Sequence, residues 1–167
     1  MDLFAARRHA AFSPCRNYRY RLKSVLNESL PRILWIMLNP STADEHVDDP
    51  TVRRVWQWSS RWGYGTATIC NLFAWRSTDP AGLRASPDPV GPDNDEHILR
   101  AAESSHTIIC AWGVHGSYLD RSTAMRRLLA GRRLHCLALT KDGEPGHPLY
   151  LRGDVLPVLM PSHWPAS

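Results

Sequence analysis

Four apolar segments of the chain end in residues that can bind a ligand. Six of the seven residues from Ile33 to Asn39 are apolar, and Pro40, which has no backbone N–H to donate, then ends the segment. An apolar run without polar alternation is typical of a strand buried on both faces of a sheet. The groups that follow the four segments are Asn39-Pro40-Ser41, Asn71, Trp112-Gly113 and His147-Pro148. Because ligands bind at the carboxyl ends of the strands in open α/β sheets, the sequence predicts that these groups share one pocket.

A second group of reactive side chains is acidic. The segment 44–49 contains three aspartates, one glutamate and one histidine. Acids favour the first turn of a helix, and Asp49 before Pro50 has the residue types of a helix cap and a first helical position. The same carboxylates are also a candidate site for Mg²⁺ or another divalent ion, as in a nuclease. Both interpretations are open.

These groups need a scaffold that brings distant segments together. Apolar and β-branched runs predict buried strands at 33–39, 66–73, 107–113 and 134–140, with an edge or hairpin strand at 18–22. Helical spacing and capping residues predict helices at 51–62, at 93–103 and from Asp120 or Ser122 to Leu129, and the Pro-rich segment 79–92 is a predicted long loop. Strands that alternate with helices predict an α/β three-layer sandwich with a central, mainly four-stranded parallel sheet.

Composition restricts the class of protein. A chain of 167 residues favours a single domain, here with an N-terminal arm at 1–17, a core at 18–151 and a tail at 152–167. No apolar run is long enough to cross a bilayer and no signal-type segment is present, so we expect a cytoplasmic protein without a membrane partner. The four cysteines form no CxxC pair, which argues against a zinc site or an iron–sulfur cluster. The formal charge of +4 permits a polyanionic partner.

The groups at the strand ends also carry a family resemblance. The chain is similar, in Arg32 to Trp62, in Trp112-Gly113 and in His147 to Leu151, to a bacterial family catalogued only as a domain of unknown function. Its loop order resembles the uracil-DNA glycosylase superfamily over roughly residues 32–151. Leu38 to Ser41 matches the first motif of that superfamily, and the segment from His147 matches its His-Pro motif. The fold that the resemblance implies is uracil-DNA-glycosylase-like.

The resemblance implies a role for each matched residue. Asn39 corresponds to the residue that positions or activates the attacking water. Asn71 corresponds to the asparagine that hydrogen-bonds the flipped base, and His147 to the histidine that faces it. Pro148 belongs to the loop that presses on the minor groove, and Arg76 lies in a stretch similar to one that follows this asparagine in the thermostable branch. The cysteines that hold the cluster of that branch are missing here.

Glycosidic cleavage needs the chemistry that these residues offer. The reaction builds negative charge on the departing base, so a catalyst needs fixed donors aimed at the base and a held water on the far face of the sugar. His147 would donate to a carbonyl oxygen of the base, and Asn71 has both a donor and an acceptor for a Watson–Crick edge. Asn39 can only orient water, because an amide does not titrate usefully. Asp44 is the nearest carboxylate candidate for a general base.

The remaining candidates concern the base and the DNA backbone. Phe73 or Tyr150 would stack on an extruded base, and Lys141 beside the His147 loop would contact phosphate. Ser41 replaces the tyrosine of the uracil-specific enzymes, which leaves room for a 5-substituent. We therefore expect a monomeric DNA glycosylase, without metal or cofactor. It would excise uracil or a modified, 5-substituted or hypermodified pyrimidine and leave an abasic site, in DNA repair or antiviral defence.

Other functions remain open. An enzyme that cleaves free nucleosides or nucleotides would have the same scaffold and would not depend on duplex DNA. A non-catalytic nucleic-acid-binding module would show steep salt dependence and release no base. A metal-dependent nuclease would lose activity with EDTA. The structural alternative for each polar residue is that the asparagines satisfy turn backbones, that the histidine is an ordinary loop residue and that the aspartates only start helices.

Overall fold

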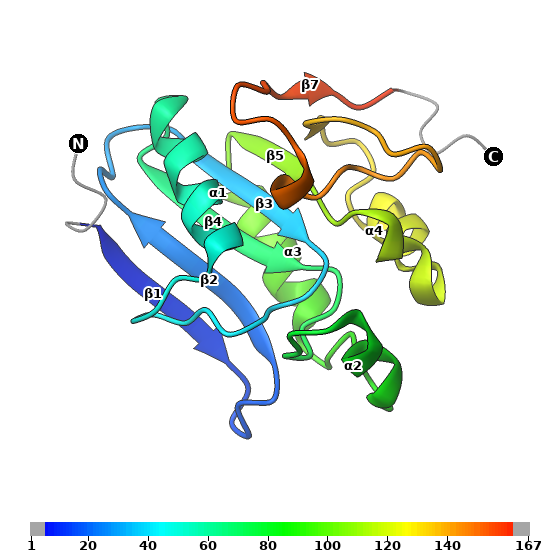
Figure 1. Ribbon diagram of the computed structural model, residues 1–167. Coiled ribbons are helices and arrows are strands. Elements are labelled where there is room, and N and C mark those ends of the chain that lie inside the picture. Colours follow the sequence, from blue (N-terminus) through cyan, green and yellow to red (C-terminus); the bar gives the residue numbers. More distant parts are fainter. Residues whose placement is uncertain (1–5, 162–167) are drawn as a thin grey trace.

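The computed structural model describes residues 6–161 and contains one mixed sheet (Figure 1). Its strands are β1 (Arg7–Phe12), β2 (Arg19–Val25), β3 (Arg32–Met37), β4 (Thr66–Asn71), β5 (Thr107–Cys110), β6 (Leu134–Cys136) and β7 (Val158–Leu159). Its helices are α1 (Pro50–Arg61), α2 (Pro80–Ala85), α3 (Asn94–Glu103) and α4 (Arg121–Leu128), with short 3₁₀ segments η2 (Val114–Asp120) and η3 (Pro148–Tyr150).

The sheet has the order β1-β2-β4-β3-β5-β6-β7. The neighbours among β4, β3, β5 and β6 are parallel, which confirms the predicted α/β class and its four parallel strands. β2 adds to β4, β1 to β2 and β7 to β6, all antiparallel. Residues 19–22 therefore belong to an interior strand, so the edge alternative is wrong, whereas the hairpin alternative is confirmed by the antiparallel pairing of β2 with β1.

Both terminal regions contribute to the sheet, which the sequence did not predict. Residues 7–12 of the expected N-terminal arm form β1, and residues 158–159 of the expected tail form β7. Each pairs with a strand that would otherwise expose unpaired backbone groups at the edge of the sheet. The ends of the arm and of the tail, 1–5 and 162–167, lie outside the described residues.

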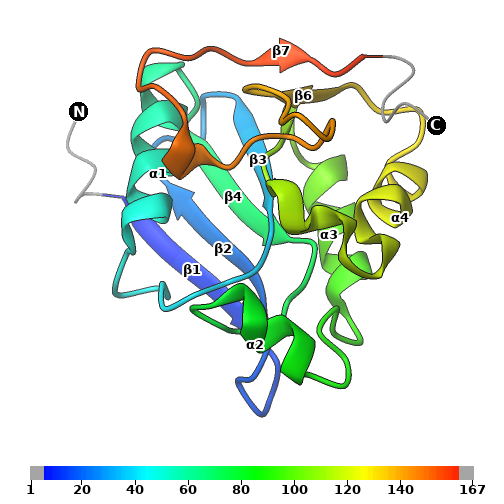
Figure 2. The ribbon, with the colours of Figure 1, turned by 45° about the vertical axis from the view of Figure 1, so that its right-hand side comes forward.

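Helices cover both faces of the sheet, so the molecule has three layers (Figure 2). Trp35 on β3 packs with Val55 and Trp58 of α1, whereas Ile36 packs with Ile98 of α3 and Met125 of α4. Successive side chains of a strand point to opposite faces, so a strand between two helical layers is apolar throughout. This arrangement explains the unbroken apolar run of β3.

Capping residues fix the start of α1 and place it beside the carboxyl end of β3. Asp49 accepts a hydrogen bond from the backbone of Val52, and Pro50 occupies the first turn. Trp58 and Trp62 stack on Trp35 of the sheet with ring centroids 6.1 and 5.8 Å away. The helix therefore holds its first turn in a defined position at this edge of the sheet.

A short helix lies in the segment that was predicted to be one long loop. α2 begins at Pro80, and the side chain of Asp79 accepts a hydrogen bond from the backbone of Ala81. The Asp-Pro pair is the same helix-start signal that begins α1. The many prolines of the segment 79–92 concealed it. No helix in residues 6–161 is long and apolar enough to cross a membrane.

Candidate active site

A cavity of about 700 Å³ opens at the carboxyl ends of the parallel strands. It lies where β3 has β4 on one side and β5 on the other, the point at which the strand order reverses and ligands bind in open α/β sheets. Of the residues that the sequence singled out at the strand ends, Asn39, Ser41, Asn71, Trp112, Gly113 and His147 line it, and so does Tyr150. The prediction that the strand ends share one pocket is confirmed for these residues, while their roles stay predictions.

Asn39 has a fixed orientation. Its amide nitrogen donates to the carbonyl oxygens of Ser77, at 2.8 Å, and of Pro40, at 3.2 Å. Both amide hydrogens are thereby used, so Oδ1 is the atom left for a donor from outside the protein. A water molecule that donates to this oxygen would be oriented by it.

Asn71 ends β4 on the floor of the cavity and is 2% exposed. Among the described residues its Oδ1 has no hydrogen-bond partner. The buried amide of Asn94 donates to the backbone carbonyls of Asn71, at 2.9 Å, and Leu72, at 3.1 Å, which holds the strand end in place. A buried acceptor without a partner costs free energy unless a ligand satisfies it.

His147 lies on the loop after β6, and its backbone sets its protonation pattern. Nδ1 accepts a hydrogen bond from the backbone N–H of Leu149 at 3.3 Å. In the neutral ring the proton is then on Nε2, which is free to donate. Burial lowers the pKa of His147, and the nearby charge of Asp49 opposes this effect only in part. The ring is therefore neutral near pH 7, with the N–H at Nε2.

A buried carboxylate holds the His147 loop on the rest of the molecule. Glu144 accepts hydrogen bonds from the Trp112 indole at 2.6 Å and from the Ser122 hydroxyl at 2.9 Å. Gly113, with a φ of 77°, donates its backbone N–H to Pro145, and an added Cβ there would lie 3.4 Å from the Cβ of His147. The end of β5 and the start of α4 thus position the histidine.

The carboxylate that lines the cavity is Asp49 and not Asp44, the residue that was expected to act as the general base. Asp44 is absent from the lining, and its Oδ1 accepts the backbone N–H groups of His46 and Val47 at 2.7 and 2.8 Å. These two bonds lower the pKa of Asp44. Asp49 lines the cavity and uses Oδ1 to cap α1, so its Oδ2 is the oxygen left for a ligand.

Arg19 also lines the cavity and was missed by sequence reasoning. It is on β2, 2% exposed, and its Nη1 donates to the carbonyl of Ala43 at 2.7 Å. Burial lowers the pKa of Arg19 to about 10, so the guanidinium remains charged at neutral pH. The available signal was a basic residue in an alternating strand, a pattern that equally fits an exposed edge.

Four other candidates lie outside the cavity lining. Phe73 is fully buried in the core next to Tyr118, with a centroid distance of 5.6 Å, so its ring is not available to stack on a base. Arg76 lies over the ring of Phe12, and Lys141 is exposed on the loop before His147. Pro148 is the buried first residue of η3. The other two residues of η3, Leu149 and Tyr150, are exposed.

Comparison with known proteins identifies the family. A family model described as "Protein of unknown function (DUF1643)" matches residues 19–149. The chain belongs to the DUF1643 family. The expected membership of a family known only as a domain of unknown function is therefore confirmed. The match begins at Arg19 and includes both Asn39 and His147. No curated protein and no solved structure matches the chain.

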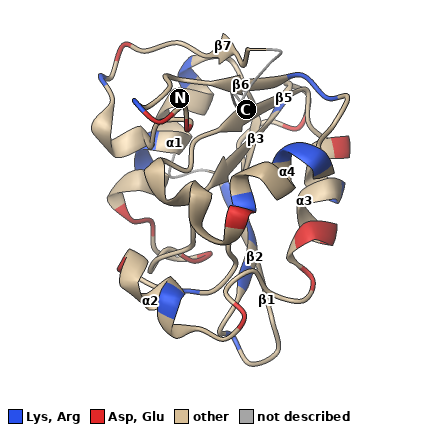
Figure 3. Ribbon diagram, turned by 90° about the vertical axis from the view of Figure 1, so that its right-hand side faces the viewer, with Lys and Arg blue, Asp and Glu red and all other residues tan. Residues whose placement is uncertain are grey.

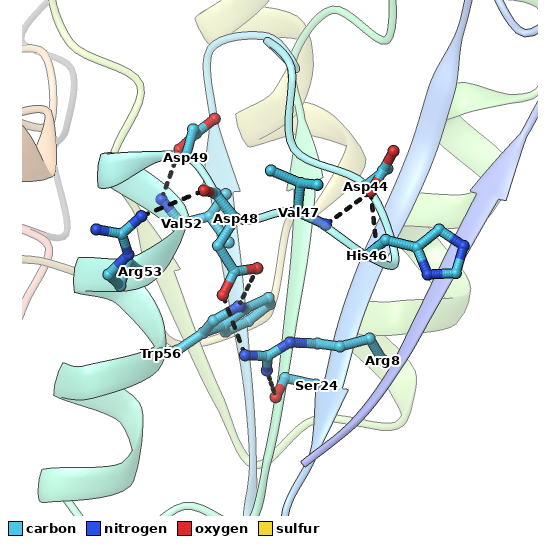
Figure 4. A network of polar contacts seen from close by, with 10 residues as sticks. All are labelled: Arg8, Ser24, Asp44, His46, Val47, Asp48, Asp49, Val52, Arg53 and Trp56. Carbon is cyan, nitrogen blue, oxygen red and sulfur yellow. Dashed lines mark hydrogen bonds and ion pairs between the residues drawn. The ribbon is translucent and has the colours of Figure 1, made fainter. Parts of the chain in front are cut away.

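Each aspartate of the acidic segment 44–49 makes hydrogen bonds within the protein (Figure 4). Asp44 caps a turn, Asp49 caps α1, and Asp48 accepts from the Trp56 indole at 3.2 Å and pairs with Arg8 at 3.1 Å. The three carboxylates point in different directions. Within residues 6–161, no group of three or more His, Cys, Asp or Glu side chains is placed to hold a metal ion.

Charge on the DUF1643 protein does not form one basic track on the side that carries α2, α3 and α4. Figure 3 shows basic and acidic segments interspersed on this side. Arg84 lies on α2, and Arg126 and Arg127 lie in the last turn of α4, whereas the first turn of α3 is acidic. A functional proposal for this family member therefore has to rest on the cavity.

Proposed function

We propose that the protein is an N-glycosyl hydrolase that acts on a pyrimidine base extruded from DNA. The observation that carries the proposal is the cavity at the strand ends, where Asn39, Asp49, Asn71 and His147 face one space. Such a cavity combines donors for a departing base with a carboxylate and an amide oxygen for water. Flipping is required because the glycosidic bond of a stacked base is not accessible to a pocket of this kind.

His147 and Asn71 would stabilise the leaving group. The free Nε2–H of the neutral His147 donates to a carbonyl oxygen of the base as negative charge develops on it. The amide of Asn71 reads the hydrogen-bonding edge of the base, and its unsatisfied Oδ1 gains a donor when a base N–H arrives. Tyr150 is 85% exposed at the rim, with its ring centroid 5.7 Å from that of His147, and can cover the bound base.

Asn39 and Asp49 would handle the nucleophile. Water donates one hydrogen to Oδ1 of Asn39 and the other to Oδ2 of Asp49. As the water oxygen bonds to C1′ of the sugar, the C1′–N bond breaks and its electron pair leaves with the base. Asp49 takes the water proton, and a proton from solvent neutralises the released base. The products are an abasic site and the free pyrimidine.

The test is single-turnover base release from oligonucleotides in EDTA. The panel contains uracil, thymine mismatches, 5-hydroxymethylated and glucosylated cytosine, and free nucleotides. We expect release from at least one DNA substrate and its loss in both Asn39→Ala and His147→Ala. Phe73→Leu, which changes only the core, is the matched control and should keep the activity. No release from any substrate, with salt-sensitive DNA binding retained, would instead identify a binding module.

Base release should decrease in acid because of His147. Its Nδ1 accepts the Leu149 N–H only while the ring is neutral, and its pKa lies below the ordinary value of about 6.5. The rate of base release should therefore be constant above about pH 6.5, where the ring is neutral, and should fall as the pH falls through the pKa of His147. The pH–rate profile should lose this acid limb in His147→Gln. A rate that rises toward acid would show that the imidazolium is the donor and would contradict this role.

Ser41 should set the size of the accepted base. Its small side chain lines the cavity, so Ser41→Tyr would fill space that a 5-substituent occupies. We expect this variant to lose release of a 5-substituted pyrimidine by about 10-fold or more while uracil release changes less, since steric exclusion of this kind is typically worth 10- to 200-fold. The ratio of the two rates is the measurement. An unchanged ratio means that Ser41 does not border the 5-position.

A further inference from the structure

The cavity contains a buried cation, Arg19, that forms no ion pair among the described residues. Burial lowers its pKa by more than the nearby charges of Asp49 and Asp44 raise it. Arg19 is 2% exposed, and among the described residues the only hydrogen bond of its side chain runs from Nη1 to the carbonyl of Ala43. Its Nε has no partner, and Arg19 makes no ion pair with any residue in 6–161. The mechanism proposed above does not use this side chain.

The other buried arginine of the described residues is paired within the protein. Arg121 is also buried, at 5% exposure, but its Nε donates to the carbonyl of Leu72 at 2.8 Å and its guanidinium pairs with Asp95. A buried charge is expensive unless it is paired and hydrogen-bonded. Arg121 meets that requirement within the protein, whereas Arg19 has one carbonyl acceptor and no ion pair among the described residues, which leaves its Nε for a ligand.

The position of Arg19 shows which part of a ligand it would meet. β2 lies beyond β4 in the sheet order, and the backbone N–H of Arg19 donates to Ala74 just after the end of β4. The cavity therefore runs along the sheet edge from Arg19 through Asn71 and Asn39 to the His147 loop. A base held between Asn71 and His147 leaves the Arg19 end of the cavity for a substituent.

We propose that Arg19 binds an anionic oxygen group of the ligand, such as a carboxylate carried by the pyrimidine. That the ligand contains a pyrimidine ring rests on the proposed function. That it carries a negative charge rests on the buried guanidinium. The Nε–H and an Nη–H of a guanidinium form a planar fork that matches two carboxylate oxygens. A phosphate offers the same chemistry, so a nucleotide phosphate is the alternative source that the experiment has to separate.

The experiment measures calorimetric binding of free compounds, which needs no catalysis. The probes are uracil, uracil-5-carboxylate, inorganic phosphate, uridine and uridine monophosphate. We expect uracil-5-carboxylate to bind more tightly than uracil. Arg19→Met should weaken the binding of uracil-5-carboxylate by about 10- to 100-fold, as expected for the loss of hydrogen bonds to a charged group. Arg19→Lys should keep part of the preference for the anion. A gain confined to phosphate and uridine monophosphate assigns the group to a nucleotide phosphate.

Thermal unfolding separates this role from a structural one, with Arg121→Met as the matched control. Removing an unpaired buried charge should leave the melting temperature of Arg19→Met unchanged or higher, whereas breaking the Arg121–Asp95 pair should lower it by about 10 °C. Equal binding of uracil and its carboxylate, or a large loss of stability in Arg19→Met, would overturn the inference. If the protein releases uracil from DNA but binds uracil and its carboxylate equally, only the Arg19 inference fails. If it binds the carboxylate through Arg19 but releases no base, only the glycosylase proposal fails.

Discussion

Asp49→Asn is expected to lower single-turnover base release by about 10²- to 10⁴-fold, the usual contribution of a general base. Asn cannot take the water proton, but it caps helices as well as Asp does, so α1 should keep its start. The expected result is therefore a loss of rate with an almost unchanged melting temperature. Both quantities can be measured on the same preparation.

Asp44→Asn is the matched control for this prediction. Both aspartates belong to the loop between β3 and α1, and each accepts backbone hydrogen bonds through Oδ1. Only Asp49 lines the cavity. Asp44→Asn should keep the rate within about twofold, because an acid outside the cavity cannot reach the water that the proposal places there. Equal losses in the two variants would mean that the loop conformation matters and that neither carboxylate acts as the base.

Glu144→Ala is expected to destabilise the fold by about 3 kcal/mol and to reduce base release strongly. The substitution leaves the indole N–H of Trp112 and the hydroxyl of Ser122 without their buried acceptor. It also frees the loop that positions His147. Urea unfolding measures the stability, and single-turnover kinetics at a temperature where the variant stays folded measures the rate.

A graded series tests the origin of this effect. Ser122→Ala removes one of the two donors and keeps the stronger contact with Trp112, so we expect it to cost about 1 kcal/mol and to change the rate little. Glu144→Gln keeps the shape of the side chain but places an amide where two donors need acceptors. Its losses of stability and rate should lie between those of the other two variants. If Glu144→Ala loses stability but keeps the full rate, the carboxylate does not position His147.

Much of the central sheet followed from local sequence. The apolar runs identified all four parallel strands, because a strand covered by helices on both faces has no place for polar residues. Asp49 and Pro50 gave the start of α1 through short-range capping chemistry. The same logic located Asn39, Asn71 and His147, since parallel strands bring their carboxyl ends to one edge whatever the details of packing.

The tertiary structure alone decided how neighbouring side chains were divided between the cavity and the core. Asp44 and Asp49 have the same chemistry, and only the path of the loop turns one into the cavity and the other onto its own backbone. Phe73 follows Asn71 by two residues but packs beside Tyr118. Arg19 reaches the cavity because β2 pairs with β4, a contact between residues far apart in sequence. Periodicity and capping are local properties, whereas these outcomes depend on long-range pairing and burial.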